Sequence, residues 1–322
     1  MGIVTLFAIA EEKMKKLEVS VQTGGWYDEA KPEESMKFIK ECGFEGVDYN
    51  IDVLFKSTFE PENLTSFFDK DMEQLYEYFS SLKQAAEKYE VSISQAHSLF
   101  PIYYHGQDGK NRYVLEVTKK MIAVCGYLNC SAIVVHPWSN PELRKEEIRQ
   151  INLDIYRKLM PAAKEYGVKV CLENLYTMYV DSYHEGSCTD AEEACWYIDT
   201  LNAEAGEEIF GFCLDVGHAN MMGKNVYQYI TTLGKRLTVL HINDNGGTCD
   251  GHMIPYTQRV MKGHGAVVDW DGFIKGLKEI GYEGALSFET FRVTDQMPDE
   301  VLIEVLRLIS AIGRYFRKEI QV

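Results

Sequence analysis

The sequence alternates eight short runs of apolar and β-branched residues with eight longer segments of helical periodicity. The predicted strands cover residues 17–22, 46–51, 91–97, 131–137, 168–174, 210–218, 237–244 and 284–290. The predicted helices cover residues 32–43, 69–89, 111–128, 142–166, 189–201, 226–234, 269–281 and 298–318. Strands joined through helices in this way form a parallel sheet with crossover connections, so the alternation predicts an α/β fold.

The number of strand–helix units selects the architecture within that class. Eight units close a (β/α)8 barrel, the TIM barrel, and 322 residues suit a single core of this kind. An open doubly wound sheet is the alternative, but such a sheet usually has a glycine-rich phosphate turn after its first strand, and "VQTGGWYD" has no G-x-G-x-x-G pattern. We therefore expect one barrel domain over residues 17–322. Long connections at about 52–68 and 244–268 are expected to be functional loops.

Residues 1–16 are expected to form a leader that is poorly ordered. Their apolar run is about eight residues long, which is too short to span a membrane, and no Lys or Arg precedes it as in a signal peptide.

Polar side chains with metal-binding chemistry stand at or just after the ends of the predicted strands. They are His97, His136, Glu173, Asp215, His218, His241 and Glu289, and the loop after the seventh strand adds Asp250 and His252. The carboxyl ends of the strands meet at one rim of a β/α barrel, so these groups are expected to converge. Removing such a ring of carboxylates and imidazoles from water would cost much free energy unless a cation lay among them. Oxygen and nitrogen donors suit divalent Mn, Co, Zn, Mg or Fe.

Two details refine this expectation. Asp215 is expected to point inward as a ligand, and Gly217 to let the chain turn so that His218 returns over the barrel mouth. Thiols are absent from the rim set, which disfavours a structural zinc knot, and Cys171 and Cys213 are expected to act as small apolar side chains.

The segments "CLEN", "CLDVGH", "HIND", "DGH" and "SFET" occur in this order and resemble those of the xylose-isomerase-like barrel superfamily. The segment "ECGFEGVDYN" is similar to the first helix and second strand of that superfamily. Its members include sugar and sugar-phosphate isomerases and epimerases, ketose 3-epimerases, inosose dehydratase-like proteins and apurinic-site endonucleases. The resemblance covers nearly the whole chain and is specific for the superfamily, but poorly specific for the substrate.

The resemblance implies a role for each matching residue. The ligands of a divalent metal ion in an epimerase-type site would be Glu173, Asp215, His241 and Glu289. Glu173 and Glu289 would also be the catalytic pair that exchanges the substrate proton. The residues that would contact substrate, or ligate further metal ions in an endonuclease-type centre, are His97, His136, His218, Asp250 and His252. The chain departs from many relatives at His264, where a Gly-Glu-Gly turn is usual, and the role of that missing carboxylate is left open.

Other residues near the strand ends have two interpretations each. Arg292 is a candidate contact for an anionic group on the substrate, and the alternative is a surface arginine. The candidates for the floor of a sugar pocket are Trp26, Trp138, Tyr176 and Phe291, and the alternative is loop packing. The Tyr-Tyr-His segment at 103–105 is a candidate lid.

The leading interpretation is a metal-dependent isomerase or epimerase of a sugar or sugar phosphate. One glutamate would remove a proton next to a carbonyl and give an enediolate. The alternatives are an inosose dehydratase-like lyase, a multi-zinc phosphodiesterase acting at abasic DNA sites, and a non-catalytic sugar-binding protein on the same scaffold.

Charge and cysteine usage restrict the partners. The net charge is −16, and we find no basic block, so nucleic acid and anionic membranes are not expected to bind. Neither a dinucleotide loop nor a Walker loop is visible, which disfavours nicotinamide and ATP chemistry. Eight cysteines without C-x-x-C spacing predict reduced thiols in a cytoplasmic protein. A homo-oligomer is consistent with the resemblance, because relatives form dimers and tetramers, but no interface can be read from the sequence.

Overall fold

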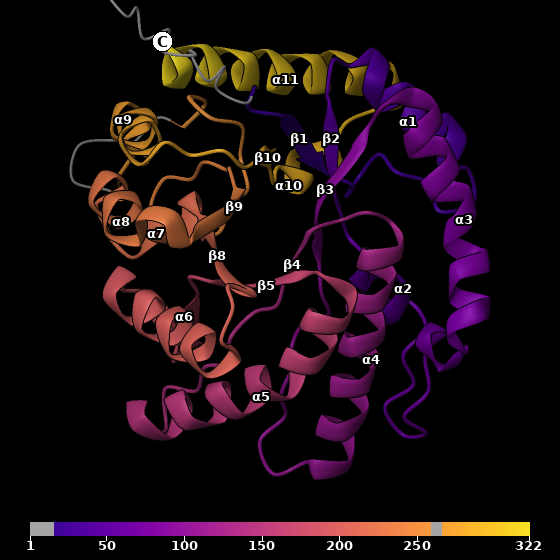
Figure 1. Ribbon diagram of the computed structural model, residues 1–322. Helices are drawn as coiled ribbons and strands as arrows, with labels where there is room; N and C mark the ends of the chain where they lie inside the picture. Colours follow the sequence, from indigo (N-terminus) through magenta and orange to yellow (C-terminus); the bar gives the residue numbers. More distant parts are fainter. Residues whose placement is uncertain (1–15, 259–265) are drawn as a thin grey trace, which may run out of the picture.

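Eight parallel strands form the inner wall of the protein in the computed structural model, which describes residues 16–258 and 266–322 (Figure 1). The strands are β1 (Val19–Gln22), β2 (Gly46–Tyr49), β3 (Ser92–His97), β4 (Ala132–Val134), β5 (Lys169–Glu173), β8 (Phe210–Asp215), β9 (Leu237–His241) and β10 (Leu286–Phe288). Their order in the sheet is β10-β1-β2-β3-β4-β5-β8-β9. A parallel bridge between Ile242 and Phe288 joins β9 to β10 and closes the ring. The predicted (β/α)8 barrel is confirmed. The alternative interpretation, an open doubly wound sheet, is wrong because the ring of strands is closed.

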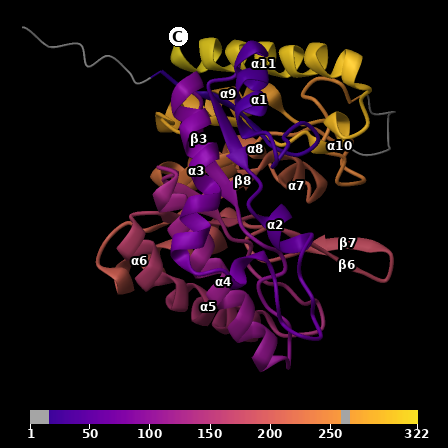
Figure 2. The ribbon, with the colours of Figure 1, turned by 90° about the vertical axis from the view of Figure 1, so that its right-hand side faces the viewer.

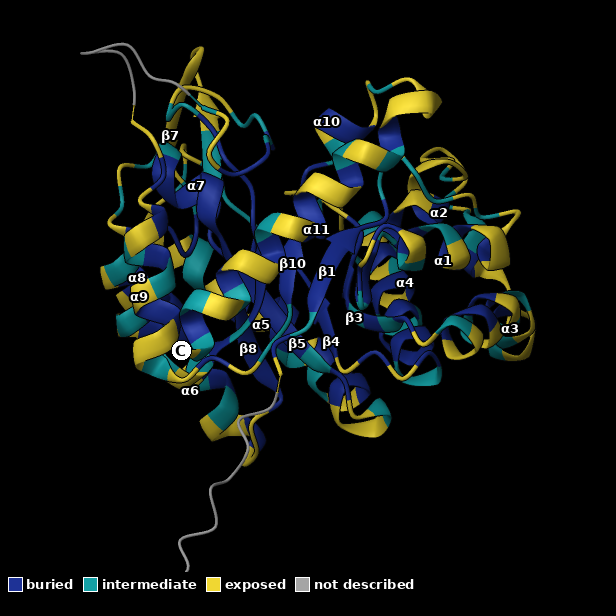
Figure 3. Cartoon of the chain, turned by 90° about the horizontal axis from the view of Figure 1, so that it is seen from above, coloured by how far each residue is buried: buried dark blue, intermediate teal, exposed yellow. Residues whose placement is uncertain are grey.

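Eight helices alternate with these strands and cover the outside of the barrel. They are α1 (Pro32–Glu41), α3 (Met72–Tyr89), α4 (Asp108–Tyr127), α5 (Lys145–Tyr166), α6 (Ala191–Ala205), α8 (Val226–Leu233), α9 (Trp270–Ile280) and α11 (Asp299–Gln321). Each was expected from periodicity, although α4 begins earlier and α5 later than predicted. Figure 3 shows buried strands inside a layer of helices whose outward faces are exposed.

The structure contains elements that the sequence reading missed, and most follow strand ends. The long connection at 52–68 begins with α2 (Asp52–Lys56), and the 3₁₀ helix η1 (Phe67–Asp69) starts at its end. A hairpin of β6 (Tyr176–Tyr179) and β7 (Ser182–Glu185) follows β5 and projects from the barrel (Figure 2). The others are α7 (Val216–Met221), the 3₁₀ helix η2 (Gly234–Arg236) and α10 (Phe291–Thr294). These pieces are too short for a periodic signal, so hydrophobic patterning could not reveal them.

The barrel interior has an apolar layer beneath its polar rim. It consists of Ala132, Val134, Cys171, Cys213 and Val239, all nearly inaccessible to solvent. The expectation that Cys171 and Cys213 act as small apolar side chains is therefore confirmed. Branched and small side chains of this kind commonly fill such barrels. This packed apolar layer lies beneath the charged groups of the rim.

The described residues include no helix that is long and apolar enough to cross a membrane. All eight cysteines lie in the described segments and are free, as the sequence predicts.

Candidate active site

A cavity of about 540 Å³ opens at the carboxyl ends of the strands. Its inner wall includes His97, His136, Glu173, His218, Asp250, His252 and Glu289, and its outer wall includes Asn50, Asp52, Lys56, Phe100, Tyr176 and Phe291. Seven of the residues expected at the rim thus line one space.

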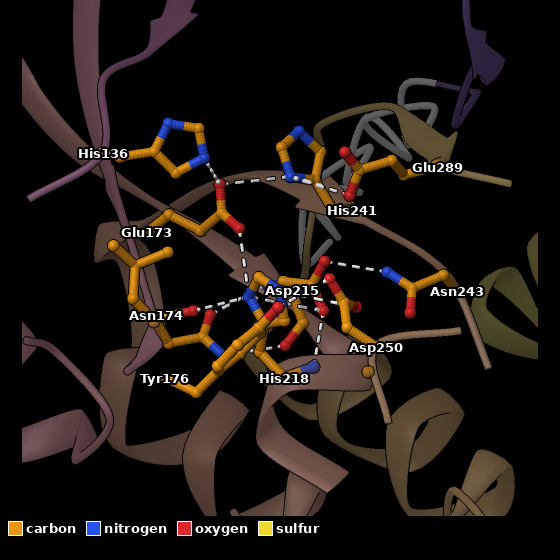
Figure 4. A network of polar contacts seen from close by, with 12 residues as sticks. His136, Glu173, Asn174, Tyr176, Asp215, His218, His241, Asn243, Asp250 and Glu289 are labelled. Carbon is orange, nitrogen blue, oxygen red and sulfur yellow. Dashed lines mark hydrogen bonds and ion pairs between the residues drawn. The ribbon is translucent and has the colours of Figure 1, made fainter. Parts of the chain in front are cut away.

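His241 lies between the two candidate catalytic glutamates. Its Nδ1 atom is 3.3 Å from Glu173 Oε2 and 3.5 Å from Glu289 Oε2, as Figure 4 shows. The three side chains come from β5, β9 and the residue after β10, and none is more than 5% exposed. The arrangement places two carboxylates around one imidazole nitrogen in a buried site.

Asp215 ends β8 and is held firmly. Its Oδ1 accepts the backbone N–H of His218 at 2.6 Å, which caps α7, and its Oδ2 accepts from Asn243 Nδ2 at 2.8 Å. Asn174 bonds both the N–H and the carbonyl of Asp215. The possible ligand atoms of Asp215, Glu173 and His218 lie within 4.8 Å of one another. Asp215 therefore reaches the same cluster as Glu173.

The expected role of Gly217 is wrong. Gly217 lies in α7 and makes no turn with positive φ. A Cβ atom at this position would lie 1.9 Å from Asn243 Oδ1 and 2.7 Å from Asn245 Nδ2. Glycine is needed because the loop after β9 approaches the helix closely, and α7 itself carries His218 to the cavity.

Protein groups alone push the pKa values of the two glutamates apart. Burial raises the pKa of Glu289 to about 8, and the charges of Asp215 and Glu173 act in the same direction. Burial would raise the pKa of Glu173 too, but His136 and His241 hold it well below its usual range. One member of the pair is thus suited to accept a proton and the other to donate one.

The cluster needs positive charge. Burial would lower the pKa of His241, yet the neighbouring Cys213, Glu289 and Glu173 raise it well above its usual value. Several buried atoms have no hydrogen-bond partner among the described residues: Glu173 Oε2, His136 Nδ1, His241 Nδ1, His241 Nε2 and Asp250 Oδ1. A divalent cation would satisfy carboxylate oxygens and an imidazole nitrogen together, so these residues fit such an ion.

One thiol does approach the cluster, which the sequence reading did not anticipate. The possible ligand atoms of Cys213, Glu173 and His241 lie within 4.8 Å of one another. Burial raises the pKa of the Cys213 thiol well above its usual value, which keeps it protonated and apolar in character.

The remaining histidines form two groups on either side of the glutamates. His97 Nε2 lies 3.1 Å from His136 Nε2, which lies 3.1 Å from Glu173 Oε2. On the other side, His252 Nε2 lies 3.1 Å from Asp250 Oδ2, and His218 Nε2 lies 3.7 Å from Asp250 Oδ1. These side chains surround the space that a substrate would enter.

Arg292 is not among the residues that line the cavity. It is exposed on α10, and its guanidinium lies 5.4 Å from the ring centre of Phe291. The aromatic candidates divide in the same way, because Tyr176 and Phe291 line the cavity and Trp26 and Trp138 do not. His264 lies outside the described residues.

The candidate lid also lies away from the cavity lining. Tyr103 and His105 pack against Trp138, with ring centres 5.0 Å and 5.9 Å away.

Sequence reasoning missed several polar residues that support the rim. Gln22 Nε2 donates to Glu289 Oε1 at 2.9 Å, and Asp48 Oδ2 lies 3.2 Å from His241 Nε2. Gln95 Nε2 donates to Asp48 Oδ2 at 3.0 Å. The available signal was a polar residue inside each apolar run, such as Asp48 within "GVDYN".

Comparison with known proteins agrees with this architecture. The chain is 29% identical over 194 residues to an inosose isomerase of Bacillus subtilis, an alignment that covers 59% of this chain and 65% of that protein. It is 27% identical over 258 residues to an inosose isomerase of Bacillus velezensis, which covers 78% of this chain and 88% of that protein. A solved structure of the IOLI protein with a bound zinc atom superimposes with a TM-score of 0.67 at 21% identity, covering 92% of this chain and 98% of that one.

The family model described as "Xylose isomerase-like TIM barrel" matches residues 36–312, most of the barrel. This chain therefore belongs to the xylose isomerase-like TIM barrel family.

Proposed function

We propose that this protein is a divalent-metal-dependent isomerase or epimerase of a small sugar, and that Glu173 and Glu289 move the substrate proton. The observation that carries this proposal is the placement of these two carboxylates on either side of His241 Nδ1 in a buried cluster. The residues that would hold the ion are Glu173, Asp215, His241 and Glu289. The names of the relatives, inosose isomerases, support the reaction class.

The chemistry that a bound divalent ion supplies is polarisation of the substrate carbonyl, which acidifies the neighbouring C–H bond. Glu173, whose pKa is lowered, accepts the proton from that carbon and leaves an enediolate. Glu289 returns a proton to the opposite face in an epimerisation, or one glutamate returns it to the next carbon in an isomerisation. A positioned acid–base group of this kind typically contributes about 10²–10⁴-fold in rate.

The charge of the cavity favours a neutral sugar over a sugar phosphate. Among the described residues that line it, Lys56 is the one Lys or Arg, and it pairs with Asp52 at 2.5 Å. Acidic side chains at Glu173 and Asp250 would repel a phosphate. The apolar rings of Phe100, Tyr176 and Phe291 offer surfaces for the C–H face of a sugar.

The inosose dehydratase-like lyase shares these first steps and differs in the bond that the enediolate breaks. The multi-zinc phosphodiesterase is supported by further groups of possible ligands, which include His97 with His136 and Glu173, and His218 with Asp250 and His252. A single-metal site and a multi-metal site differ in the number of ions bound per chain, which metal analysis measures.

The test is incorporation of solvent deuterium into unphosphorylated ketoses, inososes and their phosphates, with Mn²⁺, Co²⁺ or Zn²⁺ added. We expect carbon-bound deuterium in a neutral compound, and its loss in Glu173→Gln and Glu289→Gln. Glu193→Gln is the matched control, because Glu193 is buried but pairs with Arg149 outside the cavity. Full exchange in either site variant would refute the two-glutamate scheme. Binding of a sugar without exchange would favour the non-catalytic protein, and cleavage of abasic DNA would favour the phosphodiesterase.

A further inference from the structure

Asp48 is a buried carboxylate inside the barrel that the proposed chemistry does not use. It lies in β2, is 0% exposed, and its Oδ2 atom is 3.2 Å from Nε2 of His241, which is also 0% exposed. Strands β1 and β10 lie between β2 and β9 in the ring, so this contact crosses the interior. A carboxylate without solvent is costly unless charged or polar groups compensate it.

Gln95 fixes the orientation of Asp48. Its Nε2 atom donates to Asp48 Oδ2 at 3.0 Å and to the carbonyl of Leu240 at 3.2 Å. Leu240 directly precedes His241, so Gln95 ties the carboxylate to the strand that carries the histidine. The ring of His97 stacks on that of His241, with centres 4.9 Å apart and planes at 20°. The ring of His241 is thus restrained by stacking, and its Nε2 atom lies 3.2 Å from the carboxylate of Asp48.

The two nitrogens of His241 face different partners. Nε2 faces Asp48, and Nδ1 faces Glu173 and Glu289. A neutral imidazole carries its proton on one nitrogen and a lone pair on the other, and a carboxylate favours the proton on its own side. Nδ1 would then present its lone pair to the glutamates, where only a cation could use it.

We propose that Asp48 is a positioning residue that holds His241 with its Nδ1 lone pair aimed at the cation site, an inference that rests on the proposed function. Asp48 does not line the cavity, and its carboxylate forms a group of possible ligand atoms with His97 and His241. In the proposed arrangement Asp48 acts on His241 rather than on the ion. Partners of this kind fix the tautomer and ring orientation of histidine ligands, and their loss typically lowers metal affinity by about 10- to 100-fold. Asp48 is one such partner, and Gln95 in turn holds Asp48.

The first test measures the affinity of the metal-free protein for Co²⁺ and Zn²⁺ by competition with a chelating dye. Asp48→Asn keeps the shape but removes the charge, and we expect it to bind about 10- to 100-fold more weakly than the wild type. Gln95→Met, a second variant in case Asp48→Asn does not fold, should weaken binding to a smaller extent. The visible spectrum of bound Co²⁺ should change in Asp48→Asn, because the orientation of a ligand changes.

Asp244→Asn is the matched control. Asp244 is 2% exposed and accepts hydrogen bonds from Tyr256 and Trp270 rather than from His241. We expect this variant to lose thermal stability but to keep the wild-type metal affinity. Wild-type affinity and an unchanged Co²⁺ spectrum in Asp48→Asn would overturn the inference and leave Asp48 a merely structural residue.

The outcome is separable from that of the proposed function. A wild type that binds Co²⁺ but exchanges no deuterium would defeat the isomerase proposal, while the affinity ratio still decides the role of Asp48. A wild type that binds no divalent ion would overturn both.

Discussion

Tyr176 Oη donates a hydrogen bond to Asp250 Oδ2 over 3.1 Å and thereby ties the β6–β7 hairpin to the loop after β9. The ring of Tyr176 also packs edge-on against His218, with ring centres 5.0 Å apart. Both Tyr176 and Asp250 line the cavity. The base of the hairpin is therefore part of the cavity wall, although its tip extends into solvent.

Tyr176→Phe should loosen this hairpin. The lost hydrogen bond has a charged acceptor, and such a bond contributes about 1.5 kcal/mol or more to stability. Its loss corresponds to a roughly tenfold larger population of molecules in which the hairpin has detached from the barrel. Limited proteolysis between Met178 and Tyr183, followed by mass spectrometry, should then run about tenfold faster. Tyr183→Phe is the control, since Tyr183 contacts Tyr176 through its ring, and Phe keeps that ring. Equal cleavage rates in Tyr176→Phe and wild type would contradict the prediction.

Metal removal should lower the melting temperature. Binding at 100 times Kd adds about 2.7 kcal/mol to the free energy of unfolding, which we expect to shift the melting temperature by about 5 °C. Differential scanning calorimetry with EDTA, and then with added Zn²⁺ or Mn²⁺, measures the shift. Glu173→Gln should melt at the same temperature with or without the ion, whereas the control Glu193→Gln should keep the shift. A shift retained by Glu173→Gln would place the ion elsewhere.

Gly217→Ala should destabilise the protein and disturb the proposed metal site. The new Cβ would lie 1.9 Å from Asn243 Oδ1, and Asn243 bonds Asp215. Overpacking of this kind typically costs about 1–3 kcal/mol of unfolding free energy, measurable by urea titration. Gly109→Ala in α4 is the control, because its Cβ would have open space within 4 Å, and we expect no loss of stability. A Gly217→Ala protein of wild-type stability would show that the loop after β9 yields easily.

Glu29 should make the stability of the fold fall between pH 4.5 and 6. Burial raises the pKa of Glu29 to about 6, even though the hydroxyl groups of Tyr49 and Tyr78 donate to it and lower the value. The folded state then binds a proton that the unfolded state releases above about pH 4.5, so stability decreases as pH rises towards 6. A shift of about 1.5 units corresponds to roughly 2 kcal/mol.

Urea unfolding of Glu29→Gln across this pH range should show a smaller decrease than wild type. Tyr49→Phe removes the hydroxyl that donates to both oxygens of the carboxylate, and it should enlarge the decrease. Parallel pH profiles for all three proteins would be inconsistent with a raised pKa at Glu29.

Arg292→Ala should leave KM for a neutral substrate unchanged. The side chain is exposed and lies against Phe291, away from the residues that line the cavity. Steady-state kinetics on the sugar that exchanges deuterium checks this, with Phe291→Ala as the comparison expected to raise KM. A selective loss of activity towards a sugar phosphate in Arg292→Ala would restore the role that the sequence suggested for Arg292.

The barrel and most of its rim were readable from the sequence for one reason. Parallel strands place their carboxyl ends together, so a polar residue at the end of an apolar run has a known position without any knowledge of its neighbours. His97, Glu173 and Glu289 were found in this way, and all three line the cavity. The roles assigned to them remain predictions.

The residues that support the rim could not be predicted from the sequence, because their roles depend on contacts across the barrel. Asp48 and Gln95 lie within strands, and only the closed ring brings them to His241. A turn was predicted at Gly217 because glycine is common in turns. The constraint in the structure is instead the side chain of Asn243, which lies 26 residues later in the sequence. Arg292 was placed by its distance along the chain, and the short helix α10 turns it outward.

The bridge between Ile242 and Phe288 closes the ring, and it also ties two residues of the candidate site to one seam of the barrel. His241 and Glu289 are the immediate neighbours of that bridge, and their side chains approach within 3.5 Å. A slip of one residue in the pairing of β9 with β10 would turn one of these side chains to the other face of the sheet. Closure of the ring and geometry of the site therefore depend on the same strand register.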